Sequence, residues 1–290
     1  MSCPDCYRGG VTTEHPKGKE TTIHGLATYV AEPPAGTTPK DIILYITDAF
    51  GWQHANNRVL ADHYASRGGY LVYVPDFMGG HAIDAYGLVV MDKVAGKAAT
   101  WADTFWKPWY IARMVPSIIS FMWFCRPAVR KGLVYEFAQK LRSSPAPYQT
   151  NGKPLRIGAA GFCWGGKFGV WLAQDEPASR LAEAQPLVDC VFTAHPSFLS
   201  VPADIEAVTL PLSVAVGEDD MALPADKIQQ MKKMLEAKPG AEGRYEVNII
   251  PGAKHGFAVR SHPNDAHEME CALRAEDQAI AWFDKWLARD

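Results

Sequence analysis

The feature that most constrains the fold is an alternation of short apolar runs with helical stretches along this 290-residue chain. Residues 41–47 (DIILYIT) and 70–75 (YLVYVP) are apolar almost throughout, as expected of strands that are buried on both faces. A helical stretch at residues 56–66 lies between them, and two glycines end it. This alternation predicts an α/β fold, with a mostly parallel sheet and helices on both of its faces.

The same alternation continues in the second half of the chain. Further strands are expected at residues 155–161, 189–194, 212–217 and 245–250, and helices at 165–173, 225–235 and 265–287. Ahead of the first buried run, ATYVAEP is expected to form a short edge strand, and residues 1–20 are polar and loop-like. The length suits one large α/β domain, so we expect a single domain over residues 1–290.

Residues 84–142 interrupt this alternation with a long, helical and aromatic-rich segment. Its aromatic residues include Trp101, Phe105, Trp106, Trp109, Phe121, Trp123 and Phe124. Two interpretations stay open. The segment is either an insertion that packs its own side chains on the sheet, or a cap whose apolar face lines a substrate pocket.

Composition excludes several classes of protein. Lys and Arg number 29 and Asp and Glu 32, a net charge of −3, which gives no electrostatic footprint for nucleic acid. The most apolar stretch, residues 110–125, is interrupted by Arg113 and Pro116 and is shorter than the ~20 residues that a membrane span needs. Residues 1–10 lack the apolar run of a signal peptide, and six cysteines are too few for a disulfide scaffold. We expect a cytoplasmic protein, monomer or homodimer, with reduced thiols and without membrane or nucleic-acid partners.

The strongest chemical signal is GFCWGG, residues 161–166, which lies directly between a predicted strand and a predicted helix. A G-x-nucleophile-x-G turn in this position is a nucleophile elbow, here with Cys163 at its centre. Its glycines are needed because a Cβ would clash with the neighbouring strand or helix. The turn also directs the sulfur to a helix N-terminus, where the helix dipole favours a thiolate. The alternative is a buried structural cysteine in an ordinary turn.

An acid and a base follow in the order expected for such an elbow. Asp219 and Asp220 come after the strand LSVAVG, and His255 comes after YEVNII. Both positions are carboxyl ends of strands, where open α/β sheets keep their sites. The turn G-x-x-D-x-x-x-P favours Asp220 over Asp219 as the acid. We therefore predict Cys163, Asp220 and His255 as catalytic residues, with a plain loop histidine as the alternative for His255.

Two backbone N–H groups are expected to form an oxyanion hole. One belongs to Trp164, the residue after the nucleophile, and the other to Ala49 in the loop after the first buried strand. Asp48 beside it is unexpected, because a carboxylate opposes the negative charge that develops there. It is either turned away as a turn residue or paired with a cation or with the thiol.

Several segments together resemble the dienelactone hydrolase (carboxymethylenebutenolidase-like) family, especially its fungal-type members. They are TDAFG, YVPDF, GFCWGG, AHPSF, GEDD and KHGFAVR, and they extend from Asp48 to Arg260. The resemblance implies the α/β-hydrolase fold, a Cys–His–Asp triad, no metal and no cofactor, and a small lactone or ester as substrate. It also implies that Asp48 takes the place of a glutamate that accepts the thiol proton, and that Arg260 is similar to an arginine that binds the substrate carboxylate.

Taken together, these features predict a cysteine-dependent hydrolase of a lactone or activated ester that acts through a thioester intermediate. One alternative is an acyltransferase, or a hydrolase of a bulkier aromatic acyl substrate in a biosynthetic pathway. Another is a non-catalytic ligand-binding relative. Cys3 and Cys6 form a lone CxxC that lacks a second ligand pair for zinc. His195 in AHPSF is either a pocket residue or a structural loop histidine.

Overall fold

The computed structural model describes residues 9–88, 101–150, 152–180 and 185–287. Its strands are β1 (Lys19–Ile23), β2 (Leu26–Ala31), β3 (Ile42–Ile46), β4 (Leu71–Pro75), β5 (Ile157–Phe162), β6 (Cys190–Ala194), β7 (Leu212–Asp219) and β8 (Tyr245–Lys254). They form one sheet in the order β1-β2-β4-β3-β5-β6-β7-β8. Only the β1–β2 and β2–β4 pairs are antiparallel. The predicted α/β fold with a mostly parallel sheet is confirmed.

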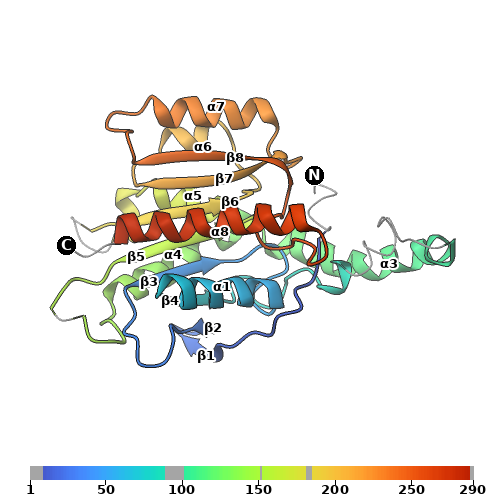
Figure 1. Ribbon diagram of the computed structural model, residues 1–290, viewed down its shortest axis with the longest axis horizontal. Helices are drawn as coiled ribbons and strands as arrows, with labels where there is room; N and C mark the ends of the chain where they lie inside the picture. The colour runs from blue at the N-terminus through green and yellow to red at the C-terminus, as the bar shows by residue number, and fades with distance from the viewer. Residues whose placement is uncertain (1–8, 89–100, 151, 181–184, 288–290) are drawn as a thin grey trace.

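Helices cover both faces of this sheet (Figure 1). They are α1 (Ala55–Gly68), α3 (Trp101–Phe124), α4 (Pro127–Ser143), α5 (Trp164–Ala173), α6 (Ala203–Glu206), α7 (Ala225–Glu236) and α8 (Ala266–Leu287), with a 3₁₀ turn at Pro177–Ser179. One apolar cluster joins the sheet to α1 and α8, and a second joins it to α4, α5 and α7. Every helix and buried strand expected from the sequence is present, with ends that differ by a few residues.

The central strand β3 shows why these runs are apolar throughout. Ile42, Leu44 and Ile46 point into the cluster that contains α5, while Ile43 and Tyr45 point into the cluster that contains α1 and α8. All five residues are fully buried. Because successive side chains of a strand alternate between faces, a strand covered on both faces needs apolar residues at every position.

The expectation of an edge strand at ATYVAEP is wrong. This segment forms β2, which pairs with β4 on one side and with β1 on the other. The true edge strand, β1 (KETTI), carries exposed polar side chains and lacks an apolar pattern, which is why the sequence did not reveal it. Charged residues on an edge strand also hinder pairing with a further chain.

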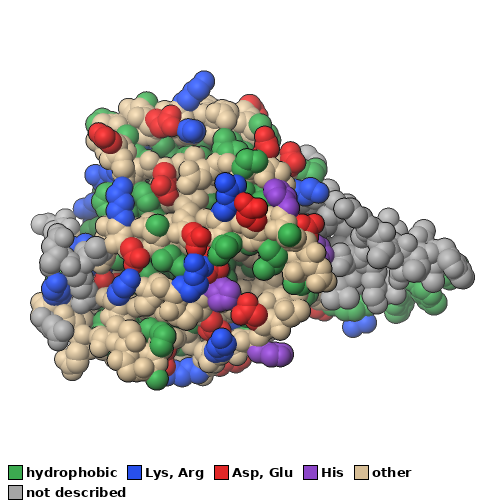
Figure 2. Space-filling view, viewed as in Figure 1, with side chains coloured by type: hydrophobic (Ala, Val, Ile, Leu, Met, Phe, Trp, Pro, Cys, Tyr) green, Lys and Arg blue, Asp and Glu red, His purple; other side chains and the backbone are tan. Residues whose placement is uncertain are grey.

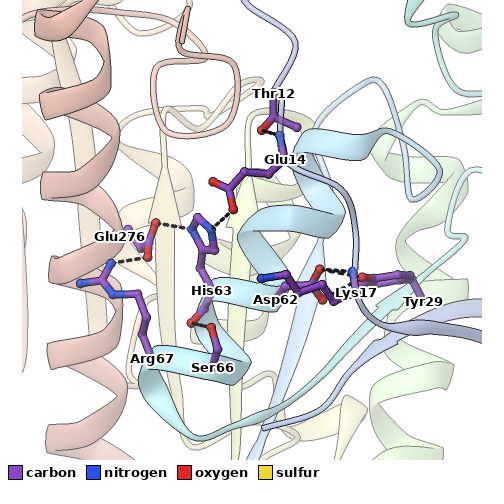
Figure 3. Close-up of polar contacts among 9 residues, drawn as sticks. All are labelled: Thr12, Glu14, Lys17, Tyr29, Asp62, His63, Ser66, Arg67 and Glu276. Atoms are coloured by element: carbon purple, nitrogen blue, oxygen red, sulfur yellow. Dashed lines mark hydrogen bonds and ion pairs between the residues drawn. The ribbon is translucent and has the colours of Figure 1, made fainter. Parts of the chain in front are cut away.

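A polar cluster ties the segment before β1 to α1 and α8 (Figure 3). His63 of α1 contacts Glu276 of α8 through Nδ1 at 3.0 Å and Glu14 through Nε2 at 3.4 Å. Arg67, one turn further along α1, also donates to Glu276. These contacts link α1 to α8, and both helices cover the same face of the sheet.

In the aromatic segment at residues 84–142, α3 and α4 follow residues 89–100, which lie outside the described residues. The C-terminal end of α3 packs beside the elbow: Phe121 and Cys125 are buried, and the Trp164 indole donates to the Cys125 carbonyl at 2.6 Å. The rest of α3 extends away from the sheet (Figure 1), where Phe105 and Trp109 are 72% and 62% exposed. Hydrophobic side chains are visible at the lower edge of this projection (Figure 2).

Neither interpretation of this segment therefore holds for all of its aromatic residues, since Phe121 is buried whereas Trp123 and Phe124 at the end of α3 are exposed. The side chain of Trp101 lies outside the described residues, as do Cys3 and Cys6. Of the helices that the structure describes, none combines the length and the apolar character needed to cross a membrane. The single-domain assignment stays a prediction.

Candidate active site

The turn between β5 and α5 has the strained geometry of a nucleophile elbow. Cys163 adopts φ 50° and ψ −110°, a conformation that L-residues rarely take. A Cβ on Gly161 would lie 2.5 Å from the carbonyl oxygen of Gly165, and one on Gly165 would lie 2.1 Å from that of Ile46. The steric reason for glycine at these positions, inferred from the sequence, is confirmed.

The structure brings the three predicted catalytic side chains together in one line of contacts. His255 Nε2 lies 3.2 Å from Cys163 Sγ, and His255 Nδ1 lies 2.9 and 3.0 Å from the two carboxylate oxygens of Asp220. Asp219, the other candidate acid, is exposed at the end of β7. The β7–β8 register shifts between Gly217 and Asp219, at the end of the strand, and of the two aspartates only Asp220 is buried.

The surroundings of His255 favour its protonated form. Burial by itself lowers the pKa of this imidazole, but negative charge on Cys163 and the hydrogen bond to Asp220 outweigh burial and raise the pKa to about 10. The imidazolium therefore directs its Nδ1–H to the Asp220 carboxylate and its Nε2–H to the Cys163 sulfur. This arrangement favours an imidazolium–thiolate pair over a neutral pair.

The reacting groups are enclosed by protein. The side chains of His255 and Asp220 are fully buried, and Cys163 is 2% exposed. Two surface hollows, one beside β8 and α8 and one beside the N-terminal segment, contain none of these residues. Exclusion of water strengthens the electrostatic interactions among the three groups.

The two N–H groups predicted for the oxyanion hole belong to neighbouring loops. The Gly165 N–H donates to the Thr47 carbonyl at 3.1 Å and so links the elbow to the loop after β3. Within the described part of the chain, neither the Trp164 N–H nor the Ala49 N–H has a hydrogen-bond acceptor. Both donors are thus free to bind an oxygen of a ligand.

Asp48 forms a buried ion pair with Arg260, and both side chains are fully enclosed. One carboxylate oxygen also accepts from the Phe50 N–H at 3.1 Å and from Asn57 Nδ2 at 2.9 Å. Of the alternatives open from the sequence, Asp48 is paired with a cation. Its hydrogen bonds among the described residues include none to Cys163, so its part in thiol activation stays a prediction.

Sequence reasoning missed Ser197. Its hydroxyl lies 3.4 Å from Cys163 Sγ and 3.2 Å from His255 Nε2, and its N–H donates to the Cys163 carbonyl at 2.8 Å. The available signal was its place in AHPSF, just beyond the carboxyl end of β6. Because β6 is the direct neighbour of β5, this loop lies against the elbow.

His195, from the same loop, also faces the site. It is fully buried with φ 39°, and its ring centroid lies 5.0 Å from that of His255. Among the described residues, neither of its ring nitrogens has a hydrogen-bond partner. Burial lowers the pKa of His195, which favours a neutral imidazole beside Cys163.

Comparisons with known proteins point to one family. A family model described as the dienelactone hydrolase family matches residues 26–287. The chain is 27% identical over 288 residues to Hydrolase tropI of Talaromyces stipitatus, covering 99% of this chain and 96% of the relative. It is 24% identical over 285 residues to Dienlactone hydrolase 1 of Gibberella moniliformis, covering 98% and 94%. A solved structure of a putative dienelactone hydrolase from Klebsiella pneumoniae shares the fold, with TM-score 0.59, 19% identity and coverage of 93% and 99%.

Proposed function

Because the chain belongs to the dienelactone hydrolase family, we propose that it cleaves a small lactone or activated ester through a thioester on Cys163. The observation that carries this proposal is the 3.2 Å contact between His255 Nε2 and the sulfur of a strained elbow cysteine. The order of nucleophile, acid and base along the chain is that of α/β-hydrolases.

In the proposed acylation step, the Cys163 thiolate attacks the acyl carbon of the substrate. The Trp164 and Ala49 N–H groups stabilise the oxyanion that forms, which is consistent with their lack of protein acceptors. The C–O bond then breaks, and the leaving alkoxide takes the proton from Nε2 of the His255 imidazolium. The products of this step are a thioester, neutral His255 and an alcohol group, which stays attached to the acyl chain if the substrate is a lactone.

In the proposed deacylation step, neutral His255 takes a proton from water, and the resulting hydroxide attacks the thioester. The C–S bond breaks, so the thiolate returns as the carboxylic acid leaves. Acylation has removed the negative charge of Cys163, which is one of the causes of the raised His255 pKa. The same imidazole can therefore act first as an acid and then as a base.

We further assign a positioning role to Asp48 and Arg260. The Asp48 carboxylate accepts from the Phe50 N–H and from Asn57, and these bonds fix the loop that presents the Ala49 N–H. Arg260 neutralises this carboxylate, which limits its repulsion of the oxyanion. Direct contact of Arg260 with a substrate carboxylate stays a prediction.

The test is a nitrophenyl ester assay with mass spectrometry of the protein. We expect a burst of one nitrophenol per chain, an acyl adduct on Cys163, and neither of these in Cys163→Ala. Iodoacetamide should label Cys163 ahead of Cys190 and Cys125, because burial raises the pKa of Cys190 well above its usual value and raises that of Cys125 to about 11.

The result that would overturn the proposal is Cys163→Ala retaining more than about a tenth of the activity, since loss of a nucleophile lowers kcat by on the order of 10³ or more. Product analysis with an added alcohol or amine separates the two enzymatic alternatives. Transfer of the acyl group to that acceptor in preference to water would favour the acyltransferase.

A further inference from the structure

A buried histidine beside the proposed nucleophile lacks a well-formed hydrogen bond among the described residues, and it interacts electrostatically with Cys163. His195 has zero exposure, and neither ring nitrogen is hydrogen-bonded within the described residues. Leaving a buried polar group without a partner is unfavourable for a fold. The proposed hydrolysis uses Cys163, Asp220 and His255 and gives His195 no role. Its orientation toward the site thus indicates a ligand.

The neighbours of His195 identify the chemistry of that ligand. The sulfur of Cys163 and one ring nitrogen each of His195 and His255 lie within 4.8 Å of one another, and all three residues are buried. Cysteine sulfur and histidine nitrogen are the preferred ligands of zinc, at about 2.3 and 2.0–2.1 Å. On a tetrahedral ion these bond lengths put two ligand atoms roughly 3.3–3.6 Å apart. The 3.2 Å between Cys163 and His255 is close to that spacing.

The second coordination shell is already in place. His255 directs Nδ1 to Asp220 at 2.9 Å, which leaves Nε2, on the side of Cys163, to bind a metal. A carboxylate–histidine–zinc arrangement of this kind orients the imidazole and raises its basicity as a ligand. Three protein ligands leave the fourth position of a tetrahedral ion to water or to an oxygen of a bound molecule.

We propose that Cys163, His195 and His255 together bind one zinc ion. Binding replaces the proton shared by the thiol and imidazole, which passes to the solvent, and involves no redox change. The ion occupies the sulfur and the nitrogen required for ester cleavage, so the zinc-bound protein is an inhibited form. This inhibition rests on the proposed function, whereas the binding site does not.

The experiment titrates the reduced, chelator-treated full chain with zinc sulfate by calorimetry. We expect one ion per wild-type chain and an increase in Kd of at least about tenfold to a hundredfold in His195→Ala, because the effect of losing a ligand exceeds that of losing a group that only orients a ligand. His54→Ala is the matched control. His54 is also a buried histidine with an unpartnered Nε2, but it is not among these ligands.

A second measurement needs no variant. Zinc should protect Cys163 of the wild-type chain from iodoacetamide, and an excess of chelator should restore labelling. Equal zinc affinity in wild type and a folded His195→Ala, or labelling of Cys163 at the same rate with and without zinc, would overturn the site. If zinc binds and protects as expected but the chelated protein cleaves no ester, the site stands and the proposed function fails.

Discussion

Replacement of Asp220 by asparagine tests the proposed acid against its exposed neighbour. Both oxygens of Asp220 face His255 Nδ1, and Oδ1 also accepts from the Ala222 N–H at 2.8 Å. In Asp220→Asn, the amide oxygen keeps the bond to Ala222, and the NH₂ group turns to Nδ1. It then donates where the carboxylate accepted, which forces the imidazole proton onto Nε2 and stabilises the wrong tautomer.

The size of the effect follows from this geometry. Loss of the orienting carboxylate in an acid–histidine–nucleophile site lowers kcat by on the order of 10³–10⁴. That range is about 4–5.5 kcal/mol of transition-state stabilisation. The control, Asp219→Asn, removes a charge that is exposed to solvent. Such surface changes are worth about 0.5 kcal/mol or less, which is about a twofold effect.

The assay compares kcat/KM for a nitrophenyl ester in the two variants and in wild type, with thermal unfolding to verify folding. A second readout is the rate of Cys163 alkylation against pH. With the pKa of His255 raised to about 10, the imidazolium persists through neutral pH and supports a thiolate beside it, so the wild-type rate should vary less between pH 6.5 and 9 than that of an ordinary thiol. In Asp220→Asn the rate should rise with pH, as for an ordinary thiol with a pKa of about 8.5.

Equal losses of activity in Asp220→Asn and Asp219→Asn would refute this reasoning, as would a larger loss at Asp219. A flat alkylation profile in Asp220→Asn would show that the carboxylate does not support the charge on His255. The acid of the site would then have to be sought elsewhere.

Three further perturbations test the elbow, the helix pair and the missed serine. Gly165→Ala should lower the free energy of unfolding, measured by urea denaturation, by about 1–3 kcal/mol, because the new Cβ meets a backbone oxygen. Gly132→Ala is the control: its position in a helix is open, so alanine should raise the free energy of unfolding by about 0.5–1 kcal/mol. His63→Gln should destabilise the protein most below pH 6.5 and least at pH 9. The hydrogen bond to Glu276 raises the His63 pKa, so the protonated imidazole stabilises the fold at low pH, and this stabilisation is lost as pH rises through the raised pKa. Thermal unfolding at both pH values measures the difference. Ser197→Ala should slow the pre-steady-state burst roughly tenfold, because its hydroxyl contacts both reacting groups, and an unchanged burst would leave it a structural residue.

The fold was predictable because the strands of this sheet are buried on both faces. A run such as IILYI in β3 has no polar position, and such a run between turn residues has few other interpretations. The same rule explains why the sequence did not reveal the edge strand β1. Its side chains are exposed and polar, so it has no apolar run. Whether α3 packs on the body could not be predicted for a different reason. An apolar helix that projects from the body has the same composition as one that is buried.

The candidate site was predictable only where local sequence determines geometry. The Cys163 turn follows from its glycines, and the inward position of Asp220 follows from the Gly–Pro spacing around it. The contacts of Ser197 and His195 depend instead on strand order. Residue Ala194 at the end of β6 is level with Phe162 at the end of β5, so the next residues of each strand meet. The sequence does not reveal which strands are neighbours.

The charge coupling between Cys163 and His255 gives a physical reason for sulfur at this elbow. Cysteine ionises far more readily than serine, and a thiolate charge beside His255 keeps the imidazole protonated against the effect of burial. A serine hydroxyl stays neutral at the same pH, so only the contacts with Asp220 would oppose the effect of burial on the His255 pKa. Forming the thioester removes the charge and hence part of the support for the proton, at the stage when a base is needed. In this scheme the nucleophile itself switches its partner from acid to base, while Asp220 holds the ring in place throughout.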